Sequence, residues 1–325
     1  MKYIDLHCDT LMNAFLSHKP TVTQAEGMVD IKRLREGGAM AQFFAMFLLP
    51  PGFEKFAPEA PKVTDEEYIA ALHQILMDTI EENRDVLAFA TNADQLMEND
   101  KNGKLSAFLT IEDGRSVDGK LENIQRYYDM GVRLISLTWN FENCFGAPNS
   151  TDPALMAKGL TPFGKEAVPY MQELGMLVDV SHLSDGGFWD VVALCKKPFV
   201  ASHSNLRSLS PHQRNLQEDM LQALAQHGGV AGINFGPEFL NADVTRTEST
   251  VALMSAHIRR MIDLGGIGCP AIGSDFDGIH GQMEIPDAAH MQLLFDQLHK
   301  DGLTDDQIEQ VAWKNAERVI REAMN

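Results

Sequence analysis

Residues 3–9 read YIDLHCD, a short apolar run that ends in two polar residues, His7 and Asp9. Alternate residues of a β-strand share one face, so these two side chains can point in the same direction. An imidazole and a carboxylate on one face are suitable ligands for a divalent metal. His-x-Asp alone is a weak signal, however, because a chance surface pair explains it equally well.

The same kind of run recurs along the whole chain, with helix-like segments in between. Seven further apolar, β-rich runs lie at residues 40–49, 105–111, 132–139, 176–180, 198–202, 229–235 and 271–274. Near-continuous apolar runs are typical of parallel strands that are buried on both faces. Eight strands alternating with helices predict an α/β fold, a (β/α)8 TIM barrel with parallel strands. An open doubly wound sheet is the alternative, although no G-x-G-x-x-G follows the first run.

Helix signals and a loop complete the predicted organisation. Apolar stripes and capping residues predict helices at residues 65–82, 163–174 and 303–324. Residues 50–62 are rich in proline and glycine, which predicts a loop excursion inside one domain. We therefore expect residues 1–325 to form a single barrel domain.

Composition limits the classes of function. The chain has 325 residues and a formal net charge of -19, which disfavours a nucleic-acid partner. Neither a signal peptide nor an apolar run of the ~18 residues that a membrane span needs is visible, so we expect a cytoplasmic protein without a membrane partner. The four cysteines are scattered and form no CxxC pair, which indicates reduced thiols and argues against a zinc–thiolate site.

Ionisable residues stand directly after several of the predicted strands. Glu112 follows the third run, His182 the fifth, His203 the sixth and Asp275 the eighth. In a barrel the carboxyl ends of the strands converge on one mouth, where such enzymes place their chemistry. Each residue alone could be a turn cap or a hydrogen-bonded loop residue. Their joint occurrence at matching strand ends predicts a metal site.

The number of ligands distinguishes one metal from two. Three histidines and two acids exceed what a single catalytic zinc takes, which is about three protein ligands and a water. Two metals that share one carboxylate would use all five residues: His7, Asp9, Glu112, His182 and His203. Glu112 is the natural bridge, because its strand lies between those of the other two groups. A hydroxide between two metals is a strong nucleophile, and Asp275 would be free to transfer protons.

Five motifs give the chain a family resemblance. They are DLHCDT at residues 5–10, TIEDG at 110–114, DVSHLSD at 179–185, ASHSN at 201–205 and GSDFDG at 273–278. In this order they resemble the membrane (renal) dipeptidase family of the amidohydrolase superfamily, and the resemblance spans nearly the whole chain. It implies a cytoplasmic bacterial member with two zinc ions. His7 and Asp9 would hold one metal and His182 and His203 the other, with Glu112 bridging and Asp275 transferring protons.

The resemblance also implies substrate contacts. Arg214 matches the family arginine that binds the terminal carboxylate of the substrate, which a guanidinium can do through two parallel hydrogen bonds. By its own surroundings in the sequence, Arg214 would be a surface arginine at a helix start. Mammalian members carry a histidine at the end of the fourth strand, where this chain has Trp139 followed by Asn140. We expect both to contact substrate, and the departure leaves open which group stabilises the oxyanion.

The function expected from these residues and the resemblance is that of a zinc-dependent dipeptidase. Its substrates would be free dipeptides, L-Xaa-D-Xaa included, and relatives of this kind are often homodimers. Another amidohydrolase reaction, such as deamination or the hydrolysis of a lactone or cyclic amide, could use the same ligands. A metal-binding protein without catalytic activity is the remaining alternative, although it would not need an unliganded Asp275 beside the metals.

Overall fold

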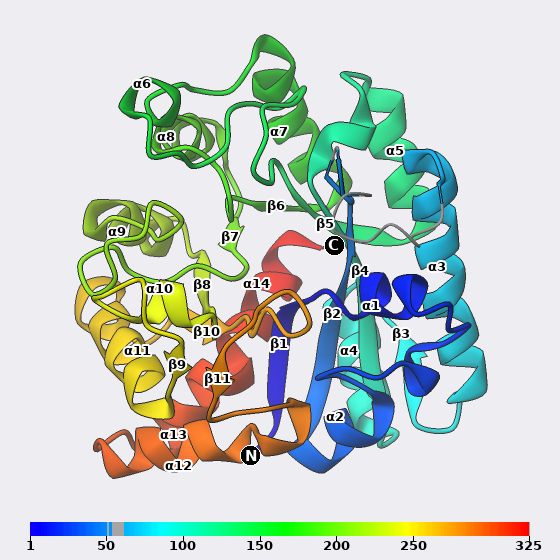
Figure 1. Ribbon diagram of the computed structural model, residues 1–325, viewed down its shortest axis with the longest axis vertical. Coiled ribbons are helices and arrows are strands. Elements are labelled where there is room, and N and C mark those ends of the chain that lie inside the picture. Colours follow the sequence, from blue (N-terminus) through cyan, green and yellow to red (C-terminus); the bar gives the residue numbers. More distant parts are fainter. Residues whose placement is uncertain (51, 54–61, 325) are drawn as a thin grey trace.

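The computed structural model describes residues 1–50, 52–53 and 62–324, and within them a parallel sheet closes into a barrel surrounded by helices (Figure 1). The barrel strands are β1 (Tyr3–Cys8), β2 (Ala39–Phe47), β4 (Leu105–Glu112), β5 (Val132–Ser136), β6 (Leu177–Asp179), β7 (Val200–Ala201), β8 (Val230–Ile233) and β10 (Pro270–Ile272). Pairing of β2 with β4 closes the ring, from Ala41 opposite Ser106 to Phe47 opposite Glu112. The predicted (β/α)8 barrel is confirmed, and each of its strands overlaps one of the predicted runs.

The helices follow the strands in alternation. They are α1 (Thr10–Leu16), α2 (Ile31–Gly37), α3 (Asp65–Glu82), α4 (Ala93–Lys101), α5 (Leu121–Met130), α6 (Pro153–Met156), α7 (Pro162–Leu174), α8 (Asp185–Leu194), α9 (Glu218–Gln226), α10 (Pro237–Leu240), α11 (Val251–Gly265), α12 (Gln292–Lys300), α13 (Asp305–Glu309) and α14 (Asn315–Ala323). Capping boxes begin α3 and α13, at Thr64 and Thr304. These side chains satisfy amide groups that the first helical turn leaves unpaired.

The structure corrects three details. The helix predicted at 303–324 is interrupted by a π turn, Gln310–Lys314, after which Asn315 donates hydrogen bonds to the carbonyls of Ile267 and Pro270. Strand β3 (Leu87–Phe89) was not predicted, and it pairs with the first residues of β4. A second small sheet joins β9 (Glu248–Ser249) to β11 (Gln282–Met283). These elements are too short to produce a pattern in the sequence. Most of the loop predicted at 50–62 lies outside the described residues.

Two apolar clusters hold the barrel together. One lies between the strands and the outer helices, and the other joins strand residues such as Leu6, Phe43 and Phe108 to Val319 and Ile320 of α14. Helix α14 therefore packs against the barrel at the centre of the molecule (Figure 1). None of the described helices is long and apolar enough to cross a membrane. The carboxyl ends of the strands carry the polar residues of the candidate site.

A buried histidine joins the segments that follow β7 and β8. His257 of α11 accepts a hydrogen bond from the amide of Leu206 through Nδ1 (3.2 Å) and donates one from Nε2 to the carbonyl of Leu240 (3.1 Å). Burial lowers the pKa of His257 to about 4. In the unfolded chain this imidazole takes up a proton near pH ~6.5, the ordinary histidine value. The contribution of His257 to folding stability is therefore complete above pH ~6.5 and is lost as the pH falls from there through ~4.

This shift predicts a stability loss in acid that depends on His257. The difference in pKa corresponds to about 3 kcal/mol at most. His257→Gln keeps a donor and an acceptor but does not titrate, so the variant should lose less stability between pH ~7.5 and ~4.5. Urea unfolding of both proteins measures the difference. Parallel stability–pH curves for the two proteins would contradict the assignment.

Candidate metal centre and active site

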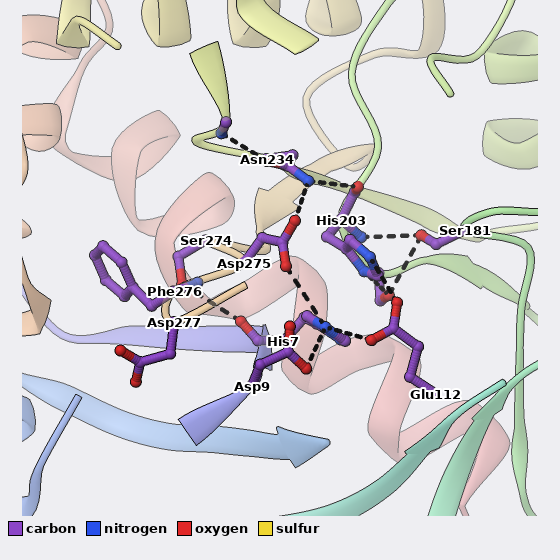
Figure 2. Close-up of polar contacts among 12 residues, drawn as sticks. His7, Asp9, Glu112, Ser181, His203, Asn234, Ser274, Asp275, Phe276 and Asp277 are labelled. Carbon is purple, nitrogen blue, oxygen red and sulfur yellow. Dashed lines mark hydrogen bonds and ion pairs between the residues drawn. The ribbon is translucent and has the colours of Figure 1, made fainter. Parts of the chain in front are cut away.

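The predicted ligands meet at the carboxyl ends of the barrel strands, and Figure 2 shows four of them, His7, Asp9, Glu112 and His203. Glu112 lies in the middle, and its two oxygens face different imidazoles. Oε2 is 3.4 Å from His7 Nε2, whereas Oε1 is 3.0 Å from His182 Nε2 and 3.6 Å from His203 Nε2. Asp9 Oδ1 lies 3.6 Å from His7 Nε2. Asp9 follows the end of β1 as the N-cap residue of α1, so the start of that helix positions its carboxylate beside His7.

The charges of the cluster are unusual for a protein interior. Burial, opposed by His7 and helped by the charge of Asp9, raises the pKa of Glu112 to about 7 and that of Asp275 to about 8. Burial alone would lower the pKa of His7, but the carboxylates of Glu112 and Asp9 raise it well above its usual range. Buried carboxylates are stable only when they are paired or protonated, or when they bind a cation. The cluster therefore takes up protons readily when empty, and bound cations would replace those protons.

The two remaining histidines have the opposite tendency. Burial, together with the nearby Arg214 guanidinium, lowers the pKa of His182 and His203 well below the usual value. Both rings are therefore neutral at physiological pH, which is the form that binds a metal. Their Nε2 atoms are 3.2 Å apart and both face Glu112 Oε1.

Buried polar atoms without partners give an independent test of the metal hypothesis. Within the described part of the chain, both ring nitrogens of His7 and Asp9 Oδ1 are buried without a hydrogen-bond partner. Such atoms are rare in folded proteins because losing water without replacement costs free energy. Possible ligand atoms gather within 4.8 Å of one another in two groups, His7–Glu112–His203 and His7–Asp9–Asp275. The residues present fit divalent cations, and Asp275 stands at the edge of the same cluster.

A buried hydrogen-bond chain orients His203. Its Nδ1 lies 2.7 Å from Ser202 Oγ, and this hydroxyl donates to Asp179 Oδ2 at 2.6 Å. The hydroxyl must therefore accept from the Nδ1–H group, which leaves the Nε2 lone pair of His203 directed at the cluster. Asp179 also accepts from the Ser136 hydroxyl at 2.5 Å, so it ties three neighbouring strands together.

Asp5 has a matching role on the other side of the barrel. It accepts hydrogen bonds from the Ser274 hydroxyl (2.6 Å) and the Ser274 amide (2.9 Å), directly before Asp275. Asn234 then donates to Asp275 Oδ2 at 2.7 Å, which fixes that carboxylate (Figure 2). Asp5 and Asp179 lie inside the motifs DLHCDT and DVSHLSD, and an acid within an apolar strand was the available signal. No sequence signal distinguished Asn234.

Several site residues have a left-handed backbone, which residues other than glycine rarely adopt. His182 has φ 69°, Asp275 62° and Asp277 68°. Each such residue costs on the order of 1 kcal/mol or more and persists where the surroundings enforce it. The backbone carbonyl of His182 accepts hydrogen bonds from the Thr138 hydroxyl (3.1 Å) and from the backbone N–H of Asn149 (2.7 Å). These contacts aim the imidazole inward as the chain leaves the strand.

The three predicted substrate residues all lie at the mouth, in different settings. Arg214 is 5% exposed and lines a cavity of about 450 Å³ together with Asn140. Its Nη1 donates to Ser204 Oγ (2.5 Å) and its Nη2 to the His203 carbonyl (3.1 Å), whereas Nε has no partner among the described residues. The expectation of a surface arginine from local sequence alone was wrong, because the fold buries this side chain.

Asn140 and Trp139 lie in the loop that follows β5. Asn140 Oδ1 is 3.2 Å from His182 Nδ1, so it orients this imidazole, a role that the sequence did not predict. Trp139 packs edge-on against Phe47, with ring centroids 5.0 Å apart. Both line a second cavity of about 720 Å³, which reaches Asp9, Glu112 and Asp275. His280, which follows the last barrel strand, lines this cavity too.

Residues 1–325 match the model of the membrane dipeptidase family, peptidase family M19. The chain belongs to this family. As a member of the membrane dipeptidase family it is a metallo-dipeptidase, a hydrolase of peptide bonds. An uncharacterized dipeptidase of Schizosaccharomyces pombe is 30% identical over 295 residues, which is 89% of this chain and 71% of that protein. An uncharacterized protein of Klebsiella pneumoniae is 36% identical over 224 residues, 67% of this chain and 82% of that one.

Solved structures of the membrane dipeptidase family share the fold. A family M19 metallo-dipeptidase superposes with a TM-score of 0.89 at 23% identity, covering 100% of this chain and 99% of that one. A metallopeptidase from Rhodobacter sphaeroides, liganded with a phosphinate mimic of L-Ala-D-Ala, has a TM-score of 0.88 at 23% identity and covers 99% of both chains. The resemblance found from the motifs is thus confirmed for family and fold.

The hydrogen-bond chain behind His203 predicts an effect on metal affinity. Ser202→Ala removes the hydroxyl between His203 and Asp179, so the imidazole loses its fixed tautomer and orientation. We expect metal affinity to fall about 10–100-fold. Competition with a chelator measures it, and Ser208→Ala, an exposed serine in the following loop, is the matched control. Equal affinities for wild type and the Ser202→Ala variant would refute the role of this hydroxyl.

Proposed function

We propose that the chain hydrolyses free dipeptides, L-Xaa-D-Xaa included, with two zinc ions at the centre of the cluster. The orientation of Glu112 supports this proposal most directly, because its two oxygens face different imidazoles. A carboxylate in this position can bridge two cations. In this arrangement one ion would be held by His7 and Asp9, the other by His182 and His203, and Glu112 would bridge them.

The metals and the chain have separate tasks in the proposed reaction. When bound, the two ions would polarise the scissile carbonyl and activate a water for attack. Asp275 would accept the proton of that water and deliver it to the leaving amine. Its geometry supports this role, because Asn234 holds Oδ2 while Oδ1 faces His7 at 3.7 Å, beside the cavity. A fixed carboxylate with one free oxygen can pass a proton from one side of the bond to the other.

Arg214 would bind the terminal carboxylate of the dipeptide. It is buried at one end of the smaller cavity, and His182 lies in the wall of the same cavity. A carboxylate close to the scissile bond would therefore meet a guanidinium, which can grip it through two hydrogen bonds. The oxygen of the Asn140 amide already contacts His182, so its nitrogen would donate a hydrogen bond to the substrate. This nitrogen or a metal would stabilise the oxyanion, and Trp139 would flank the substrate.

Stereochemistry and location complete the proposal. The Rhodobacter sphaeroides relative was solved with a mimic of L-Ala-D-Ala, which supports L-Xaa-D-Xaa substrates for this chain as well. A cytoplasmic location is supported by the four cysteines, all of which are unpaired. The single domain and the homodimer stay predictions.

The test of the proposed function is a panel of L-L and L-D dipeptides assayed with zinc-loaded protein. Free dipeptides should be hydrolysed, and their C-terminal amides should have a far lower kcat/KM because Arg214 loses its carboxylate partner. Lactones, cyclic amides and substrates for deamination form the comparison set. Turnover of one of these without any dipeptide hydrolysis would replace the proposal with another amidohydrolase reaction. No turnover at all by metallated protein would favour a metal-binding protein.

The role of Asp275 leads to a separate prediction. Asp275→Asn keeps the shape of the side chain, and its amide oxygen can accept the hydrogen bond from Asn234, but it cannot carry the proton. We expect kcat to fall by about 10²–10⁴-fold, with the metal content still near two ions per chain. Single-turnover kinetics and metal analysis measure the two quantities. Substantial residual kcat would contradict the role of Asp275, and one ion per chain in the wild type would contradict bridging by Glu112.

A further inference from the structure

Glu238 is an acidic side chain at the mouth that the proposed reaction does not use. It lies in the short helix α10, is half-buried and lines both cavities of the site. Its backbone carbonyl accepts a hydrogen bond from the Ser210 hydroxyl, which fixes this turn of the chain. Among the described residues, its carboxylate has neither an ion-pair partner nor a hydrogen bond.

The other carboxylates of the larger cavity are already engaged. Asp9, Glu112 and Asp275 face the metal cluster. Asp277 accepts hydrogen bonds from the Thr10 hydroxyl at 2.6 Å and the Met28 amide at 2.7 Å. The described lining of this cavity contains no lysine or arginine. Glu238 is thus the carboxylate that remains to meet a positively charged group of the substrate.

The smaller cavity contains opposite charges that do not pair with each other. Arg214 and Glu238 both line it, yet Arg214 directs its hydrogen bonds to Ser204 and the His203 carbonyl. The ring of Phe239, the residue after Glu238, has its centroid 6.0 Å from the Arg214 guanidinium carbon. A separated cation and anion beside one reaction centre match a zwitterion, whose carboxylate and ammonium groups would each find a partner.

We propose that Glu238 binds a cationic group of the substrate and thereby sets substrate preference. The cation is the α-ammonium of the N-terminal residue or a basic side chain, since Glu238 borders both cavities. A charge-assisted hydrogen bond to either group favours bound over free substrate. This inference rests on the proposed dipeptidase function, but it concerns a residue outside the metal cluster.

The first test is Glu238→Gln, which removes the charge at nearly constant shape. The kcat/KM values for Ala-Ala and Lys-Ala, each in the stereochemistry that the wild type prefers, should fall about tenfold. Equal losses for the two substrates would identify the α-ammonium, and a larger loss for Lys-Ala would identify the side chain. Glu238→Asp keeps the charge and should retain more activity than Glu238→Gln. Glu166→Gln, an exposed glutamate on α7, is the matched control.

The second test reverses the charge and measures binding without turnover. Glu238→Lys should disfavour Lys-Ala relative to Glu-Ala, and calorimetry with phosphinate analogues of both dipeptides should give the same order. If wild type hydrolyses dipeptides but both Glu238→Gln and Glu238→Lys keep the wild-type kcat/KM and affinities, the inference falls alone. If wild type hydrolyses no dipeptide, the proposed function falls and the inference with it.

Discussion

The burial of Glu112 between imidazoles on either side is the constraint on which the rest of the site depends. A carboxylate in the interior loses its hydration, and the nearby acids Asp9 and Asp275 add further negative charge. Such a cluster is stable only when its carboxylates are paired or protonated, or when they bind cations. The only nearby guanidinium, within the described part of the chain, is that of Arg214, which is committed to Ser204 and a backbone carbonyl. The electrostatics of the apoprotein thus favour the binding of cations at this cluster.

Two buried aspartates fix the relative positions of the strands that carry this cluster. Asp179 joins the strands that carry His182 and His203, and Asp5 joins the strands that precede Asp9 and Asp275. Both accept from a serine hydroxyl and from backbone amides, so each carboxylate is fully satisfied where water is excluded. The strain at the His182 and Asp275 backbones is tolerated because these networks fix the chain on either side.

The sequence predicted the strands and the residues that meet at their carboxyl ends because both leave strong local signals. Eight apolar runs are long enough to read, and an ionisable residue after each of several runs stands out. The supporting residues were invisible for physical reasons: Asn234 is defined by a neighbour 41 positions away, Asp275, and the burial of Arg214 depends on loops that only the fold brings together. Asn140 was expected to contact substrate, yet it first orients His182.

The predicted metal ligands and the cavity walls come from different parts of the barrel. The predicted ligands lie at strand ends or close to them. The walls of the two cavities come mainly from loops and short helices, such as Trp139 after β5 and Glu238 in α10. Loops tolerate substitution at small cost in folding stability, so they can change a charge at the mouth while the cluster stays intact. Substrate preference should therefore vary within the family through residues such as Glu238, independently of the hydrolytic chemistry.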